Sequence, residues 1–286
     1  MQLAQILGAE IVSADSRQVY RYMDIGTAKP GKEELSLVRH HLIDIINPDE
    51  DFSLAQYQQL AAESIEDIIQ RRKLPFLVGG SGQYVWATIE GWGVPRVPPN
   101  PVLRQELEEK ASRNGGEALF RQLEKINPEA AAGIDRLNTR RVIRALEISQ
   151  SGNVIQPRPS NSAPYESLVI GLTLDRAELY SRIDARVDRM VEKGLVEEVE
   201  WLAAKGYRLD LPAMSGIGYK QIGEYLKGKT TLEAAVQQVK FESHRFVRQQ
   251  YNWFRLKDGR IRWFDVQSGR AADDIAAAIN DFTGKD

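Results

Sequence analysis

A single aspartate follows the first apolar stretch of the sequence. Residues 10–14 read EIVSA, which is typical of a short buried strand, and Asp15 comes directly after them. Three roles suit a carboxylate at the end of a strand: a general base, a magnesium ligand acting through water, or a residue that shapes the turn. The turn role is the commonest for a lone aspartate, so the residue type alone leaves the choice open.

A glycine-rich turn follows a second apolar stretch. Pro75–Val78 is short and apolar, and Gly79-Gly80-Ser81-Gly82 leads from it into the helix-compatible sequence YVWATIEG. Strand, glycine turn and helix in this order are typical of an α/β domain, in which ligands bind at the carboxyl ends of the strands. A GGSG turn is a weak signal by itself, because tight turns after strands are common.

Three stretches of helical composition carry arginines. Arg182 and Arg186 lie one turn apart on one face, where they suit a departing anion or, equally, exposed ion pairs with neighbouring acids. The other two stretches contain Arg140, Arg141 and Arg144, and Arg245, Arg248 and Arg255 with Phe246, Tyr251, Trp253 and Phe254 interleaved. Cations contact phosphates and aromatic rings stack on bases, so the pattern suits RNA, although an amphipathic helix with a solvated basic face fits it as well.

Composition narrows the class of protein. The 286 residues are 42% hydrophobic and 27% charged, a mixture typical of globular domains. The sequence contains no apolar run of about 20 residues and no secretory signal pattern, so we expect a cytoplasmic protein without a membrane segment. Without cysteine there is no disulfide framework and no thiolate zinc site, and three scattered histidines do not predict a metal held by protein side chains.

The order of expected elements predicts two domains. Four prolines in residues 94–101 end the first α/β segment, and helices are expected at residues 101–113, 116–126 and 139–151. After a proline-rich linker at 156–164, a strand is expected at 167–174, and Asp175 caps a long helix that runs towards Gly194. Two more helices, the last at about 231–256, then a strand at 261–264 and a helix at 271–282 complete the chain. We therefore predict an α/β catalytic core at 1–99 and 165–286, with an inserted helical domain at 100–164.

Five motifs in order resemble the tRNA dimethylallyltransferase family. They are SADSRQVY with MDIGTAKP in residues 13–30, LVGGSGQY at 77–84, RRVIRALE at 140–147, IGYKQ at 217–221 and RQQYNWFR at 248–255. The resemblance spans nearly the whole chain. It implies a P-loop NTPase-like parallel sheet core with an inserted all-helical domain that binds tRNA.

The resemblance also implies a reaction. A dimethylallyl group would pass from dimethylallyl diphosphate to N6 of adenosine-37, just 3′ of the anticodon, in tRNAs that read codons beginning with U. Asp15 would accept the proton of the adenine amine, a poor nucleophile whose lone pair is delocalised into the ring. Arg186 would contact the diphosphate, and Mg²⁺ would be the cofactor. We expect a monomer whose partner is the tRNA anticodon stem-loop.

The family motifs assign tRNA contacts to a wider set of residues, because the target base must leave its stack to enter a pocket. The set is Asp15, Ser16, Arg17, Gln18, Ser81, Arg104, Arg140, Arg141, Arg144, Gly218, Tyr219, Lys220, Arg248, Gln249, Gln250 and Arg255. Ser81 stands where a threonine is more frequent in the family and keeps its hydroxyl. Gln249 stands where a second basic residue is usual, which removes one expected contact.

One expected motif is not found in the 286 residues. The family resemblance implies a strand and a loop of the form G-x-x-x-x-G-K-[ST], which holds diphosphate, and residues 1–8 resemble the end of the helix that follows this loop. We expect the chain as given to have an interrupted sheet, reduced stability and weak or no transfer. A start codon assigned too late is the favoured explanation, and the upstream DNA read in frame would test it.

Two other functions remain open from the sequence. An adenylate isopentenyltransferase acting on AMP would use a similar core but would leave the helical insertion and the basic helices without a role. A non-catalytic RNA-binding protein would keep the basic surface and lose the chemistry; salt-dependent binding of an anticodon stem-loop without product would favour it.

Overall fold

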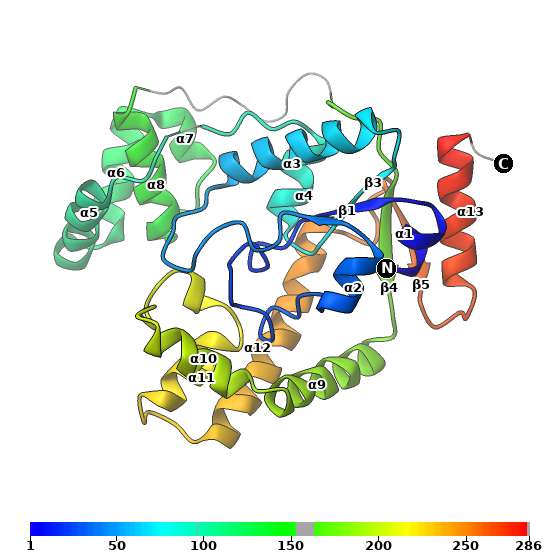
Figure 1. Ribbon diagram of the computed structural model, residues 1–286. Helices are drawn as coiled ribbons and strands as arrows, with labels where there is room; N and C mark the ends of the chain where they lie inside the picture. Colours follow the sequence, from blue (N-terminus) through cyan, green and yellow to red (C-terminus); the bar gives the residue numbers. More distant parts are fainter. Residues whose placement is uncertain (96, 153–162, 285–286) are drawn as a thin grey trace. The chain divides into compact units, whose positions relative to one another are not determined.

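The computed structural model describes residues 1–95, 97–152 and 163–284 and divides into two compact units (Figure 1). The core unit consists of Met1–Ile89 and Tyr165–Asp286, and the helical unit consists of Glu90–Pro164. The helical unit begins ten residues before the boundary predicted from the proline-rich stretch.

The elements of the core unit come from both ends of the chain. Before the helical unit they are α1 (Gln2–Ile6), β1 (Glu10–Ser13), α2 (Lys32–Leu37), β2 (His40–His41), α3 (Leu54–Gln70), β3 (Pro75–Val78) and α4 (Gly82–Ile89). After it they are β4 (Val169–Thr173), α9 (Arg176–Glu192), α10 (Leu195–Ala204), the 3-10 turn η1 (Ala213–Ser215), α11 (Tyr219–Leu226), α12 (Leu232–Trp253), β5 (Ile261–Asp265) and α13 (Ala271–Thr283).

The strands form two parallel sheets. In the first, β1 lies between β2 and β3, and in the second β4 pairs with β5. Ser13 is opposite Val78, so β1 and β3 end at the same edge. In the described part of the chain the two sheets share no strand.

Helix α3 shows how the sequence produces the packing around the first sheet. Ser53 caps the helix by accepting from the N–H of Gln56 at 3.2 Å, while the Gln56 side chain accepts from the Ser53 N–H at 2.9 Å. Its buried face carries Tyr57, Ala61, Ile65 and Ile68, which recur at helical spacing and pack in one cluster with Val12 and Ala14 of the β1 segment. Each large apolar side chain buried in this way contributes roughly 1.5–3 kcal/mol.

A second cluster joins distant parts of the chain. Val19, Tyr20 and Met23 follow β1 closely and pack against Leu195, Leu202, Met214, Tyr219 and Ile222 from α10, η1 and α11. The segment that follows Asp15 is therefore held by helices that come almost two hundred residues later. Long helix α12 contacts α9, α11 and α4 (Figure 1).

The amino end of β1 is anchored by charge. Glu10 is 2% exposed and accepts from Arg71 through both oxygens, at 2.5 and 2.8 Å. Lys73 and His41 contact the same carboxylate, each at 2.8 Å. Because Arg71 lowers the pKa of Glu10 more than burial raises it, the group stays ionised in the fold.

The helical unit contains α5 (Pro101–Asn114), α6 (Gly116–Ile126), α7 (Pro128–Ala132) and α8 (Thr139–Gln150). Helix α5 begins with proline at its first position, and Asn100 caps it by accepting from the Leu103 N–H at 3.1 Å. Leu119, Leu123 and Leu146 are fully buried at the centre of this unit.

Most predicted elements agree with the structure to within two residues at each end, and Pro75–Val78 and Gly116–Ile126 agree at both ends. Elements α2, β2 and α7 were not predicted, and among the described residues three α-helices lie between α9 and β5 where two were expected. Most of the predicted linker at 156–164 lies outside the described residues. A search of the described residues finds no helix that meets the length and hydropathy needed to cross a bilayer.

Candidate active site

Asp15 lies two residues beyond Ser13, the last residue of β1, and its side chain is half-buried. Its Oδ1 accepts from the backbone N–H groups of Arg17 at 2.7 Å and Gln18 at 3.4 Å. This is an aspartate turn, which orients the carboxylate. Among the described residues no hydrogen bond or ion pair engages Oδ2, so one carboxylate oxygen is available to accept a proton.

Ser81 lies beside Asp15, as the sequence predicted. Its Oγ accepts from the backbone N–H of Ser16 at 3.0 Å, and its own N–H donates to the Ala14 carbonyl at 3.2 Å. The glycine turn permits this approach, because a Cβ at Gly79 would collide with the backbone of Ala14. The parallel pairing of β1 with β3 thus brings the carboxylate and the hydroxyl to one edge.

Two buried tyrosine rings stack on each other near Asp15. Tyr57 and Tyr84 stack with ring centroids 3.7 Å apart, and the Tyr57 hydroxyl donates to the Ser13 carbonyl at 3.1 Å. Burial raises the pKa of both phenols, and the nearby negative charge of Asp15 raises them further. No pattern in the sequence connected either ring to the site.

Arg186 projects from α9 and is close enough to Asp15 for the two charges to interact. Desolvation lowers the pKa of its guanidinium, the Asp15 carboxylate opposes that shift, and repulsion from Arg189 adds to it. Its side chain is only partly exposed, and no carboxylate pairs with it within the described residues. Arg182, which was the alternative cation on this helix, instead pairs with Glu178 at 2.7 Å.

Arg17 and Gln18, two of the predicted tRNA contacts, have hydrogen-bond partners within the protein. Arg17 donates to the carbonyls of Pro212 and Ala213 at 2.9 and 3.2 Å and to the Ser215 hydroxyl at 3.1 Å. The Gln18 amide accepts from Ser13 and donates to two carbonyls at residues 27 and 28. Both side chains therefore shape the loop around Asp15.

The motif at residues 218–220 also divides between internal and surface roles. Gly218 is buried, and its N–H donates to Gln221 Oε1 at 2.9 Å. Tyr219 is 1% exposed and its hydroxyl donates to Glu198, so burial leaves no phenol surface for the predicted RNA contact. Lys220 is exposed and stays available to a ligand.

Helix α12 supports the glycine turn from its other side. The Gln250 amide donates to the Gly80 carbonyl at 3.3 Å, and a Cβ at Gly80 would collide with that amide. Arg248, Gln249 and Arg255 are exposed on this helix or just after it, and Arg248 donates to the Tyr180 hydroxyl at 2.8 Å. Gln250 is thus a support for Ser81, whereas the other three remain surface groups.

The arginines of the helical unit also divide into those with a partner in the protein and those at the surface. Arg104 donates to both oxygens of Glu147 at 3.1 and 2.9 Å, and Arg144 pairs with the same carboxylate, which is 2% exposed. These two cations compensate a buried charge. Arg140 and Arg141 are exposed and offer free guanidinium groups at the start of α8.

The three histidines each have a neighbour in the protein. His40 Nδ1 lies 2.8 Å from the Val38 carbonyl, His41 contacts Glu10, and His244 lies 2.8 Å from Asp184. Among the described residues no group of three or more histidine or acidic side chains is arranged to hold a metal ion.

The fold and site define a parallel α/β protein with an inserted helical unit and an acid, a hydroxyl and a cation at the carboxyl edge of its sheet. The chain belongs to the IPP transferase family, whose model matches residues 18–257. A tRNA dimethylallyltransferase of Roseiflexus castenholzii is 51% identical over 257 residues, which cover 89% of this chain and 84% of that relative.

Solved structures agree with this assignment. The crystal structure of the tRNA isopentenylpyrophosphate transferase of Bacillus halodurans is 44% identical, with a TM-score of 0.71, and the match covers 97% of this chain and 89% of that chain. A eukaryotic dimethylallyltransferase acting on tRNA gives a TM-score of 0.79 at 22% identity, covering 100% of this chain and 76% of that chain. This last likeness supports the fold alone. The predicted fold class, a P-loop NTPase-like parallel core with a helical insertion, is confirmed.

Proposed function

We propose that this chain transfers a dimethylallyl group from dimethylallyl diphosphate to N6 of the adenosine 3′ of the anticodon in tRNA. The family membership and the tRNA dimethylallyltransferases among its relatives support the reaction class. The observation that carries the proposal is the position of Asp15, half-buried at the sheet edge beside Ser81, with one carboxylate oxygen unengaged among the described residues. We further propose that it acts in the cytoplasm, where tRNA is its substrate.

In the proposed step a bond forms between N6 of the adenine and the allylic carbon while the bond from that carbon to diphosphate breaks. The amine proton passes to Oδ2 of Asp15, and diphosphate leaves with the bonding electrons. A positioned base of this kind contributes about 10²–10⁴-fold to a rate. The aspartate turn orients the carboxylate in advance, because Oδ1 is already fixed by two backbone N–H groups.

The departing diphosphate needs positive charge. Among the described cations we assign this role to Arg186, because its charge interacts with that of Asp15. Magnesium takes many of its ligands from substrate phosphates, so the diphosphate oxygens, with the Ser81 hydroxyl near by, would hold it. The ion would neutralise the leaving group, while Asp15 keeps its role as the base.

The RNA would contact the exposed cations on each unit. Arg140 and Arg141 in the helical unit, and Lys220, Arg248 and Arg255 in the core unit, have the exposure that phosphate contacts require. Ser81 would contact the flipped nucleotide, because its hydroxyl lies beside the proposed base.

The test is an assay of this chain with Mg²⁺, dimethylallyl diphosphate and an unmodified anticodon stem-loop, with AMP as a competing acceptor. We expect weak but measurable prenylation of the stem-loop and none of AMP, and Asp15→Asn should lower that weak rate by about 10²–10⁴-fold without weakening stem-loop binding. Asp51→Asn, an exposed aspartate, is the matched control. Equal rates for Asp15→Asn and the control would contradict the proposed base, and transfer to AMP alone would contradict the tRNA substrate.

A further inference from the structure

Glu198 of α10 binds the loop that follows Asp15. Its Oε2 accepts from the backbone N–H groups of Asp24 at 3.0 Å and Ile25 at 2.7 Å, and its Oε1 accepts from Gly26 at 3.2 Å. The Tyr219 hydroxyl donates to the same Oε1 at 2.6 Å. Four donors thus converge on one half-buried carboxylate, and charge-assisted bonds of this kind are about twice as strong as neutral ones.

The Tyr219 ring packs against the loop that Glu198 binds. A Cβ on Gly26 would lie 2.5 Å from Cε2 of the Tyr219 ring, so the ring packs directly on the loop backbone and only glycine fits there. Burial and the charge of Glu198 raise the pKa of Tyr219, and the phenol therefore stays protonated and keeps donating.

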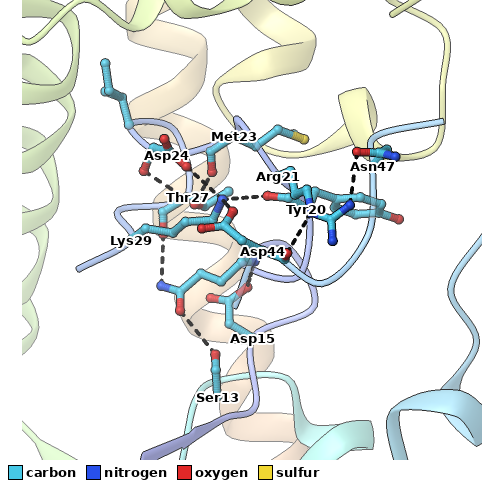
Figure 2. Close-up of polar contacts among 12 residues, drawn as sticks. Ser13, Asp15, Tyr20, Arg21, Met23, Asp24, Thr27, Lys29, Asp44 and Asn47 are labelled. Carbon is cyan, nitrogen blue, oxygen red and sulfur yellow. Dashed lines mark hydrogen bonds and ion pairs between the residues drawn. The ribbon is translucent and has the colours of Figure 1, made fainter. Parts of the chain in front are cut away.

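The Asp15 loop, residues 15–30, is strained and needs such support. Tyr22 and Ala28 have φ of 67° and 48°, in the left-handed region that side chains other than glycine rarely adopt. Backbone strain of this kind persists only where surrounding contacts fix the conformation. Lys29, a residue of the loop, supplies such contacts (Figure 2). It donates to the Tyr20 carbonyl at 2.5 Å and to the carboxylates of Asp24 and Asp44 at 2.8 and 2.5 Å.

A chain of bonds connects the segment held by Glu198 to Asp15. Gln18 donates to the carbonyls of Thr27 and Ala28, at 3.3 and 3.4 Å, and accepts from Ser13 at 3.1 Å. The Gln18 N–H also donates to Asp15 Oδ1. Movement of residues 24–28 would therefore displace the aspartate turn itself.

We propose that Glu198 is a positioning residue that fixes Asp15 for proton transfer, acting through residues 24–28 and Gln18; this inference rests on the proposed function. Helix α10, which carries Glu198, follows α9, which carries Arg186, after a short turn at Gly194. These two consecutive helices set the relative position of the base and the cation.

The test compares Glu198→Gln with Glu197→Gln, an exposed neighbour on the same helix. Glutamine keeps the size of the side chain and loses its charge. Amide hydrogen exchange at residues 24–26 should become about 10-fold faster or more in Glu198→Gln, and exchange at residues 15–18, which Glu198 does not touch, should also rise. Glu197→Gln should match the parent chain at both places.

Kinetics supply a readout that a local structural role would not move. Misplacement of a reacting group by about 1 Å lowers rates by about 10²-fold, so kcat for stem-loop prenylation should fall about 10–100-fold with little change in KM. Tyr219→Phe, which removes one of the four donors, should show the same changes on a smaller scale and guards against misfolding of the first variant.

Faster exchange confined to residues 24–26, or an unchanged kcat, would overturn the positioning role. If the parent chain shows no transfer at all, the proposed function fails, and exchange at residues 15–18 still decides whether Glu198 positions Asp15.

Discussion

The buried carboxylate at the amino end of β1 gives a prediction that needs no substrate. Glu10→Gln removes a charge that four hydrogen bonds satisfy, two from Arg71 and one each from Lys73 and His41. Breaking a buried ion pair from one side destabilises a protein by about 3–5 kcal/mol. The side chains of Arg71 and Lys73 are 32% and 48% exposed and can be solvated once the carboxylate is gone, so we expect a smaller loss than this range, about 2–3 kcal/mol.

The pH dependence has a definite sign. Arg71 holds the pKa of Glu10 well below its ordinary value in the folded state, so the group stabilises the fold fully above its unfolded pKa. This contribution is lost as the pH falls from the unfolded value towards the folded one. The difference between parent and Glu10→Gln should therefore be full at pH 7 and begin to shrink below about pH 5.

Urea unfolding at pH 7 and pH 4 measures both effects. Glu63→Gln, an exposed acid on α3, is the control and should change the free energy of unfolding by no more than about 0.5 kcal/mol. A Glu10→Gln variant as stable as this control at pH 7, or a difference that grows on acidification, would refute the electrostatic account of the anchor.

Further predictions concern the site and the helical unit. Ser81→Ala should lower the rate of transfer about 10-fold or more while Ser81→Thr stays within a few-fold, as measured by kcat/KM on a stem-loop, because the threonine keeps the hydroxyl that accepts from Ser16. Arg255→Ala should weaken stem-loop binding and reduce the slope of log K against log salt by about one, and an unchanged slope in a binding titration would exclude a phosphate contact. Glu147→Gln should destabilise the helical unit by about 2–4 kcal/mol in thermal unfolding, since it leaves two arginines without their buried partner; stability equal to the parent would show that the pair is dispensable.

The sequence predicted those parts of the fold in which local pattern and tertiary packing agree. The proline at the start of α5 and the aspartate that caps α9 appear in the structure where they were expected. Strand β2 was not predicted because two residues carry no periodicity, and only its register with β1 makes it a strand. Helix α2 buries no residue, so it has no apolar face to detect.

The sequence singled out residues that the structure brings together, but not the residues that support them. Asp15 and Ser81 lie close together because parallel strands end at one edge. For Arg17 and Tyr219 the motifs gave only a predicted RNA contact, because a polar side chain in a motif gives no indication of its partners within the protein. Glu198 had no signal at all: a glutamate on a charged helix resembles a solvated one until the backbone donors of residues 24–26 are placed beside it.

The bonds that hold the Asp15 loop span most of the polypeptide. Arg17 finds its acceptors 195 and 196 residues downstream, at Pro212 and Ala213. A nascent chain emerging from the ribosome thus carries its aspartate for nearly the whole of synthesis before the partners that order it exist. Chemistry at this edge becomes possible only after the return segment has docked, so incomplete or half-folded copies lack a competent site, and a long stretch of chain can intervene without disturbing it.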